Sequence, residues 1–167
     1  ANGLIGKQMY KYFEDKYGST FELHRIDKSV NIDLCDQDAV NHWMLKWKPD
    51  YIVHLASLTD VTESIILPQM YIKNNTLMTL NLLEAVRLYS PTTRVLLFNT
   101  DEVYQYEIGQ YVKEDSPINS RNPYSASKLC QKAMGCAYKN TYNMDIVVTH
   151  TTNVYGPEQS KVKHIGG

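Results

Sequence analysis

Tyr51-Ile-Val-His-Leu-Ala56 is an apolar run with the length of a β-strand. A strand inside a parallel sheet is buried on both faces, so it needs such a continuous run rather than an alternation of apolar and polar residues. Pro49-Asp50 predicts a turn immediately before the run. Apolar spacing from Pro68 to Tyr89 predicts a long helix after it. Together they indicate one strand-helix unit of a parallel sheet.

The same alternation extends in both directions along the chain. Further elements are predicted as helices at Ile5–Tyr17, Gln37–Trp47 and Tyr124–Tyr142, and as strands at Thr20–Arg25, Arg94–Phe98 and Asp145–His150. Asp36 can cap the second of these helices, and the polar residues 104–123 predict a loop. We therefore predict an α/β protein with a doubly wound parallel sheet of Rossmann type and right-handed crossovers.

Both ends of the sequence suggest truncation. The first predicted element is a helix that follows a glycine turn, with no strand before it. Residues Lys163 to Gly167 trail off after the last predicted strand. We expect residues 1–167 to form one domain that lacks its first strand.

Composition argues against several classes of partner. The chain has 17 basic and 18 acidic residues and a formal net charge of -1, so its charge gives no reason to expect nucleic acid or an anionic membrane. No apolar run approaches the roughly 20 residues of a membrane span, and no signal peptide is visible. Three cysteines without CxxC spacing and five histidines without a metal-ligand spacing predict no metal site and reduced thiols, as in a cytoplasmic protein.

A glycine turn leads directly into the first predicted helix. Gly3 and Gly6 are three residues apart, with Leu4 and Ile5 between them. Glycine lets backbone approach a pyrophosphate closely, and the helix N-terminus offers free N–H groups and a positive dipole end to the phosphates. Such turns are common, so this motif alone is a weak indication of a dinucleotide site.

Tyr124-Ser-Ala-Ser-Lys128 places a phenol and an ammonium four residues apart on a predicted helix, and therefore on one face. A lysine cation beside a tyrosine favours the phenolate, so we expect Lys128 to lower the pKa of Tyr124 from its ordinary value of about 10. A tyrosine tuned in this way can exchange a proton with a substrate hydroxyl. The same spacing also occurs in ordinary surface pairs.

Polar residues follow two of the predicted strands, where parallel sheets bind ligands. Asp101 and Glu102 come after the strand that ends near Phe98, and Asn153 follows the last strand. Environment can separate the pKa values of two neighbouring carboxyl groups, which gives one acid and one base. Adjacent side chains on a strand point to opposite sides, so the chain must bend after Thr100 if both are to reach one substrate. The alternative is a solvated loop.

These motifs, in this order and rough spacing, resemble the extended short-chain dehydrogenases/reductases of the NAD-dependent epimerase/dehydratase family. The resemblance spans the whole chain and rests on the glycine turn, Asp33-Leu34, His54-Leu-Ala-Ser57, Asn74, Asn99-Thr-Asp-Glu-Val-Tyr104, Tyr124-Ser-Ala-Ser-Lys128 and Thr152-Asn-Val-Tyr-Gly-Pro157. The triplet Thr100-Asp-Glu102 is most similar to that of the dTDP-glucose 4,6-dehydratases. Ser57 and Gln105 depart from the residues that are usual in the family.

The resemblance implies an NAD(P)-binding domain whose C-terminal substrate lobe lies outside residues 1–167. It implies cofactor contacts at Gly3, Leu4, Ile5, Gly6, Asp33, Leu34, Leu55, Ala56, Ser57, Asn74, Tyr124 and Lys128. It also implies catalytic roles for Thr100, Asp101, Glu102, Tyr124 and Lys128, and sugar-nucleotide contacts at Asn153 and Lys163. A homodimer through the helix that begins at Pro68 would follow the family.

The resemblance of the triplet Thr100-Asp-Glu102 to that of the dehydratases implies NAD as cofactor, whereas the end of the second predicted strand favours NADP. An acidic residue at the end of the second strand normally binds the ribose 2′-hydroxyl of NAD. Arg25 falls near this place, with Asp27 two residues later, and an arginine could pair with a 2′-phosphate instead.

The implied activity is nucleotide-sugar 4,6-dehydration with internal hydride transfer. Three alternatives stay open: a 4-epimerase, an NADP-dependent reductase of the same fold, and an inactive fragment that only binds nucleotide.

Overall fold

The structure is a computed structural model that describes residues 2–30, 32–107 and 109–156. The chain divides into two compact units. The smaller unit comprises residues 1–32 with 153–167, and the larger unit comprises residues 33–152. Each unit is described by itself.

A three-stranded parallel sheet forms the centre of the larger unit. Its strands are β1 (Tyr51–His54), β2 (Arg94–Thr100) and β3 (Ile146–Thr151), in the spatial order β1-β2-β3. Tyr51 pairs with Arg94, and Val95 pairs with Ile146. The three predicted strands are confirmed, although β1 ends two residues before Ala56 and β2 continues to Thr100. The prediction that the first of them is buried on both faces is wrong, because β1 lies at the edge of the described sheet and exposes Tyr51 and Val53.

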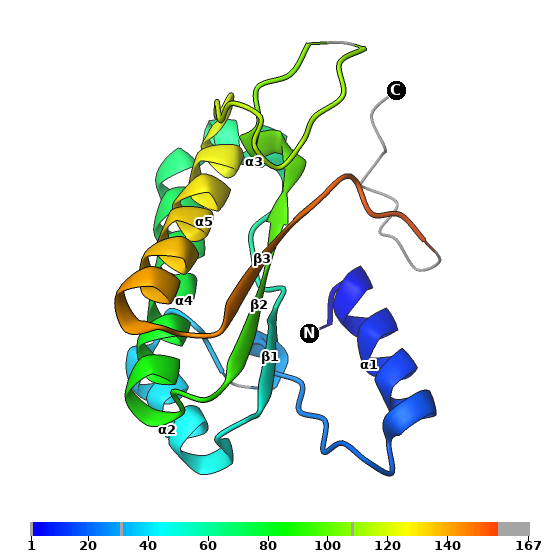
Figure 1. The fold of residues 1–167 in the computed structure, drawn as a ribbon, viewed down its shortest axis with the longest axis vertical. Helices are drawn as coiled ribbons and strands as arrows, with labels where there is room; N and C mark the ends of the chain where they lie inside the picture. Colours follow the sequence, from blue (N-terminus) through cyan, green and yellow to red (C-terminus); the bar gives the residue numbers. More distant parts are fainter. Residues whose placement is uncertain (1, 31, 108, 157–167) are drawn as a thin grey trace. The chain divides into compact units, whose positions relative to one another are not determined.

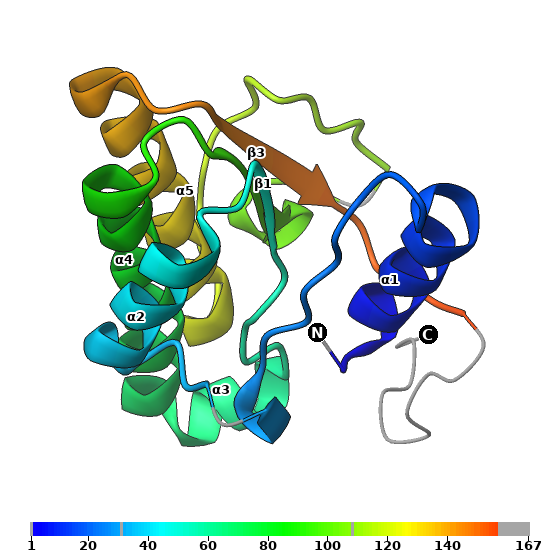
Figure 2. The same ribbon diagram turned by 90° about the horizontal axis from the view of Figure 1, so that it is seen from below.

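Three helices cover one face of this sheet: α2 (Gln37–Trp47), α4 (Pro68–Tyr89) and α5 (Pro123–Tyr142). Figures 1 and 2 show them side by side against β1, β2 and β3. α4 connects β1 to β2 and α5 connects β2 to β3, as crossovers between parallel strands require. The predicted fold class, a parallel α/β sheet of Rossmann type, is confirmed.

The hydrophobic core lies between these helices and the sheet. Its fully or almost fully buried members are Val40, Met44, Leu82, Leu83, Ala85, Val86, Val95, Leu97, Met144 and Ile146. Burial of a large aliphatic side chain stabilises a fold by roughly 1.5–3 kcal/mol. This core fixes α4 and α5 on the sheet, and with them the side chains that both helices carry at the carboxyl ends of the strands.

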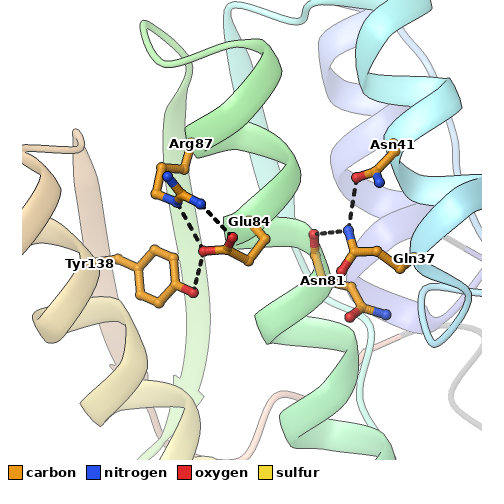
Figure 3. A network of polar contacts seen from close by, with 6 residues as sticks. All are labelled: Gln37, Asn41, Asn81, Glu84, Arg87 and Tyr138. Atoms are coloured by element: carbon orange, nitrogen blue, oxygen red, sulfur yellow. Dashed lines mark hydrogen bonds and ion pairs between the residues drawn. The ribbon is translucent and has the colours of Figure 1, made fainter.

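Polar contacts join the three helices to one another at the rim of the core (Figure 3). Glu84 of α4 accepts hydrogen bonds from Arg87, at 2.7 and 3.0 Å, and from the Tyr138 hydroxyl of α5, at 2.6 Å. The bond from Arg87 lowers the pKa of Glu84. Gln37 of α2 donates to Asn41 and to the carbonyl of Asn81 in α4, at 2.8 and 3.2 Å.

The short helix α3 (Val61–Ile66) was not predicted. Asp60 caps it by accepting a hydrogen bond from the backbone N–H of Glu63 at 2.9 Å. The spacing of an aspartate and a glutamate three residues apart is a known start signal for helices, so this element had a signal in the sequence.

The smaller unit contains α1 (Leu4–Tyr17) and the 3-10 turn η1 (Lys28–Val30). The predicted strand at Thr20–Arg25 is wrong, because residues 21–26 have no regular secondary structure. A strand needs a partner strand for its backbone groups, and in the part of the chain that the structure describes only β1, β2 and β3 form a sheet. Phe21 instead packs its ring on Phe13 and Tyr17, with centroids 6.5 and 5.7 Å apart.

Gly135 lets α5 approach the sheet closely. A Cβ at this position would lie 2.6 Å from Cδ1 of Leu97 and 3.2 Å from Cγ2 of Val148. We predict that Gly135→Leu lowers the free energy of unfolding by about 2 kcal/mol or more, because overpacking forces neighbouring side chains from their rotamers. Ala137→Leu, on the exposed side of the same helix, should change it by less than about 0.5 kcal/mol. Urea denaturation measures both, and equal effects would contradict the close approach.

Candidate functional site

The chain bends sharply where β2 ends. Thr100 is the last residue of β2, and its hydroxyl accepts a hydrogen bond from the backbone N–H of Glu102 at 3.3 Å. This bond caps the 3-10 turn η2 (Asp101–Val103). β3 supports the bend, since His150 lies 3.1 Å from the carbonyl of Thr100 and the Thr151 hydroxyl donates to the carbonyl of Asn99 at 3.1 Å. The predicted bend after Thr100 is confirmed, and both Asp101 and Glu102 are half-buried in it.

The N-terminus of α5 is tied to this turn. Asn122 caps the helix: its side chain accepts from the N–H of Ser125 at 2.8 Å, and its own N–H donates to the Ser125 hydroxyl at 3.2 Å. The side-chain amide of Asn122 also donates to Glu102 at 3.1 Å. One residue therefore fixes Glu102 relative to the helix that carries Tyr124. Sequence reasoning missed Asn122, although an asparagine before a proline at a helix start is a recognisable cap signal.

Tyr124 is buried in the first turn of α5, 8% exposed. Burial raises the pKa of Tyr124 to about 12; a hydrogen bond with the Thr100 hydroxyl opposes this shift, and the charges of Glu102 and Asp101 add to it. The prediction that Lys128 lowers this pKa is therefore wrong. The two residues share a helix face, but the ammonium of Lys128 is bonded elsewhere.

Lys128 is 4% exposed, and its ammonium points to the sheet. It donates to the carbonyl of Phe98 on β2 at 2.6 Å and to the side-chain oxygen of Gln131. An ammonium has three N–H donors, so these two bonds leave one for a ligand. Burial lowers the pKa of Lys128 to about 8.

The loop that follows β1 is held by Asn75 of α4. Its side chain accepts from the N–H of Leu58 at 2.8 Å and donates to the carbonyl of Leu58 at 3.0 Å and to the Ser127 hydroxyl at 2.8 Å. The predicted cofactor residues Leu55, Ala56 and Ser57 lie in this loop and are partly buried. Asn75 therefore fixes them relative to α5, and sequence reasoning had selected only its neighbour Asn74.

Asn74 lies beside the segment that precedes α2. The thiol of Cys35 donates to the side-chain oxygen of Asn74 at 3.8 Å, and the carboxylate of Asp33 accepts from the N–H of Cys35 at 2.9 Å. The carbonyl of Leu34 accepts from the side chain of Asn81 at 2.9 Å. The structure thus brings Asp33, Leu34 and Asn74 together between the start of α2 and the first half of α4.

The remaining predicted residues belong to the smaller unit. Gly3 precedes α1, and Leu4, Ile5 and Gly6 form its first turn; a Cβ at Gly3 would meet nothing within 4 Å. Among the described residues no side chain caps this helix.

Arg25 is exposed, and its guanidinium lies over the ring of Tyr10 at 4.3 Å. Asp27 accepts from the N–H of Asn2 at 2.7 Å and from Ser29, and the bond from the Ser29 hydroxyl lowers the pKa of Asp27. Asn153 is exposed just beyond β3, and Lys163 lies outside the described residues.

Two further findings concern residues 2–30, 32–107 and 109–156. No group of three histidine, cysteine, aspartate or glutamate side chains gathers there as a metal ion would need. No helix in these ranges has both the length and the apolar character of a membrane span.

Sequence comparison places this geometry among known proteins. Residues 1–165 match the family described as "NAD dependent epimerase/dehydratase family". The chain belongs to this family. A relative named dTDP-glucose 4,6-dehydratase, from Streptomyces niveus, is 36% identical over 136 residues, which are 81% of this chain and 40% of the relative. The chain therefore spans about two fifths of the length of such relatives.

Solved structures of three related proteins resemble the chain. The dTDP-glucose 4,6-dehydratase DesIV from Streptomyces venezuelae, with NAD and TYD bound, matches with a TM-score of 0.75 and 31% identity over 80% of this chain and 41% of that one. The UDP-glucose 4-epimerase of Thermus thermophilus, in complex with NAD, gives 0.82 and 26% over 95% and 55%. RMD from Pseudomonas aeruginosa, complexed with NADPH, gives 0.80 and 26% over 96% and 54%.

Burial of Lys128 predicts a pH-dependent stability. The pKa of about 8 in the folded chain is below the ordinary 10.5, so the unfolded chain binds more protons between pH 8 and 10.5. The contribution of Lys128 to the free energy of unfolding therefore rises with pH through that window. It is fully present above pH 10.5, and it is lost as pH falls back through the window to about 8. Relative to Lys128→Met, the protein should gain up to about 3 kcal/mol between pH 7.5 and 10.5.

Urea denaturation of both proteins across this pH range measures the difference. Lys139→Met, on an exposed part of the same helix, is the control and should show no comparable pH dependence. A constant difference between the protein and Lys128→Met would refute the inference that the ammonium is desolvated.

Proposed function

We propose that the protein is a nucleotide-sugar 4,6-dehydratase, which converts a nucleoside-diphosphate glucose to its 4-keto-6-deoxy derivative. The observation that carries this proposal is the 3-10 turn at Asp101–Val103. It brings two half-buried carboxyl groups into one turn at the carboxyl end of β2, next to a buried tyrosine. Elimination of water needs both an acid and a base at neighbouring carbons, and two carboxyl groups can supply them.

We propose a nicotinamide dinucleotide as cofactor, with contacts assigned in each unit by itself. In the smaller unit, Gly3 at the start of α1 is the proposed contact of the pyrophosphate. In the larger unit, the remaining N–H of Lys128 suits a ribose hydroxyl. A bound nicotinamide would supply the hydride acceptor and, when oxidised, a positive charge that favours the phenolate. Asp33, Leu34 and Asn74 are proposed as the adenine side of this site, and Leu55, Ala56 and Ser57 as the wall beside the sheet.

Tyr124, Glu102 and Asp101 each have one proposed proton-transfer role. Tyr124 takes the proton of the sugar 4-hydroxyl as hydride leaves C4, with Thr100 positioning the hydroxyl. The new ketone acidifies the C5 hydrogen, and Glu102 removes it as a proton. Asp101 protonates the C6 hydroxyl, which leaves as water. Hydride returns to C6, a proton returns to C5, and the redox balance closes. Asn153 and Lys163 are proposed contacts of the sugar nucleotide.

A second candidate is a 4-epimerase or an NADP-dependent reductase. Both occur on this fold without the need for an acid–base pair, and the exposed guanidinium of Arg25 favours NADP. Because the chain covers two fifths of its dehydratase relatives, a third candidate is a fragment that binds nucleotide without turnover. NAD is the proposed cofactor.

We also propose a homodimer through α4. The apolar side chains of Ile72, Leu80 and Leu88 on this helix are 36%, 39% and 51% exposed. A second copy of the chain would cover these side chains and remove their apolar surface from water.

Substitution of the two carboxyl groups should stop the reaction at different points. With nucleotide-glucose in deuterated water, Glu102→Gln should still transfer hydride from C4 of the sugar to the cofactor. It should not exchange the C5 hydrogen of the sugar with solvent. Asp101→Asn should allow this exchange and slow water loss by about 10² or more, the usual effect of a lost general acid. Mass spectrometry of the product from the full-length protein measures both steps.

Tyr124→Phe is the matched control, since it keeps the ring and should block the C4 step that precedes the others. A 4-keto-6-deoxy product with solvent deuterium at C5 supports the dehydratase. A product with an intact C6 hydroxyl and an inverted C4 would identify an epimerase instead.

Substitution of Arg25 tests whether the protein prefers NAD or NADP. If it pairs with a 2′-phosphate, NADP binds more tightly than NAD, and Arg25→Asp should reverse this preference by about tenfold or more. We expect NAD to bind at least as tightly as NADP and the substitution to change the ratio little. Lys28→Asp, on a nearby exposed residue, is the control for loss of charge. Titration of the full-length protein with both dinucleotides gives the ratio.

A further inference from the structure

A chain of buried polar side chains surrounds the ammonium of Lys128. Gln131, one turn further along α5, is 1% exposed, and Thr79 on α4 is fully buried. The side-chain N–H of Gln131 donates to the Thr79 hydroxyl at 2.9 Å. His54 at the end of β1, 3% exposed, lies 3.2 Å from the same hydroxyl. Four side chains from β1, α4 and α5 thus form one connected network.

Hydrogen-bond capacity fixes the direction of this network. The Thr79 hydroxyl has a single hydrogen, which it donates to the carbonyl of Asn75 at 2.9 Å. It can therefore only accept from Gln131, which turns the carboxamide N–H₂ toward Thr79 and the carboxamide oxygen toward Lys128. The donor or acceptor role of His54 Nε2 toward this hydroxyl depends on the tautomer of the ring. Thr79 holds Gln131 in the one orientation that presents an acceptor to the ammonium.

We propose that Gln131 is a positioning residue, whose carboxamide oxygen holds the Lys128 ammonium against β2 and keeps it protonated in the site. Lys128 has one other described acceptor, the carbonyl of Phe98. A buried ammonium with a single acceptor is poorly compensated, whereas two fixed acceptors leave its third N–H aimed at one place. The catalytic use of that N–H rests on the proposed function.

Among the described residues, no carboxylate is in direct contact with the Lys128 ammonium. Burial and, secondly, the charge of Lys128 lower the pKa of His54 to about 3, so His54 is neutral. Titratable groups on α5 and on the elements packed against it include Glu63 on α3, Tyr71 on α4, Asp101 and Glu102 on η2, Tyr124 on α5 and His150 on β3. Glu63 is bonded to the Tyr71 hydroxyl at 2.6 Å, and Glu102 to Asn122. The neutral carboxamide of Gln131 is therefore the side chain that compensates the ammonium.

The test measures the protonation of Lys128 directly. In full-length protein labelled with carbon-13 at the lysine ε carbon, the Lys128 signal is assigned by its loss in Lys128→Met and followed by NMR against pH. Gln131→Leu should lower the pKa of Lys128 by about one pH unit or more, since it removes an acceptor from the charged form. Gln131→Glu should raise it by a similar amount, because a carboxylate favours the ammonium more strongly.

Gln37→Leu is the matched control. It removes a half-buried glutamine that is bonded to Asn41 and to the Asn81 carbonyl, so it costs stability on α2 without contact with Lys128 (Figure 3). It should leave the Lys128 titration unchanged. Opposite shifts in the Leu and Glu variants distinguish positioning from a general loss of stability. If Gln131→Leu does not fold, Gln131→Glu carries the test by itself.

An unchanged Lys128 titration in either folded variant overturns the proposal. Dinucleotide binding, measured by fluorescence from pH 6 to 9.5, then separates it from the proposed function. The alkaline limb of binding should move to lower pH in Gln131→Leu and to higher pH in Gln131→Glu. If the NMR shifts appear and no dinucleotide binds to any variant, the cofactor assignment fails while the positioning of Lys128 by Gln131 stands.

Discussion

The close contact of α5 with β2 and β3 determines the geometry of the candidate site. At Gly135 the helix lies so near the sheet that even a methyl group would meet Leu97 and Val148. This contact sets the distance between the first half of α5 and β2. Lys128 can therefore reach the carbonyl of Phe98, and the side-chain amide of Asn99 can reach the carbonyl of Lys128 at 2.9 Å. Packing of apolar atoms in one half of the helix thus positions polar atoms in the other half.

Burial has opposite consequences for the two groups of the Tyr-Lys pair. A neutral phenol and a neutral amine are both favoured in a site that excludes water, so the pKa of Tyr124 rises and that of Lys128 falls. Before ligands bind, both groups are held closer to their uncharged forms than the same pair would be on a helix surface. Any ligand that brings charge or hydrogen bonds into the site acts on both, and the energy of binding is coupled to their protonation.

Periodicity in the sequence predicted most of the larger unit. The apolar runs at β1, β2 and β3 and the apolar spacing in α4 and α5 are strong signals, because they recur along the whole length of each element. The strand at Thr20–Arg25 failed because a strand depends on a partner that local sequence does not reveal. In the site, strand ends correctly indicated the bend after Thr100. The four-residue spacing of Tyr124 and Lys128 correctly predicted that they share a helix face. It did not predict which groups the ammonium of the long lysine side chain contacts.

Hydrogen bonds made by buried and half-buried amides were the least predictable part of the site. Asn75, Asn122 and Gln131 each contact a segment that is distant in sequence: the loop after β1, the turn η2 and the helix α4, respectively. Nothing in the spacing of these residues indicates such partners. Roles for the glycine turn, Arg25 and Asn153 remain predictions, as do the catalytic roles of the residues in the larger unit.

The order of the strands has a consequence for how the protein is made. β1, β2 and β3 lie in the sheet in the same order as in the chain, so each strand that leaves the ribosome can add to an edge that is already formed. β3 is the last to arrive, and it supplies the bonds to the carbonyls of Asn99 and Thr100 that support the turn η2. A nascent chain that ends before β3 can hold its α4 crossover and both earlier strands, yet it lacks the support for that turn. The turn η2 thus gains its support only after β3 has been made.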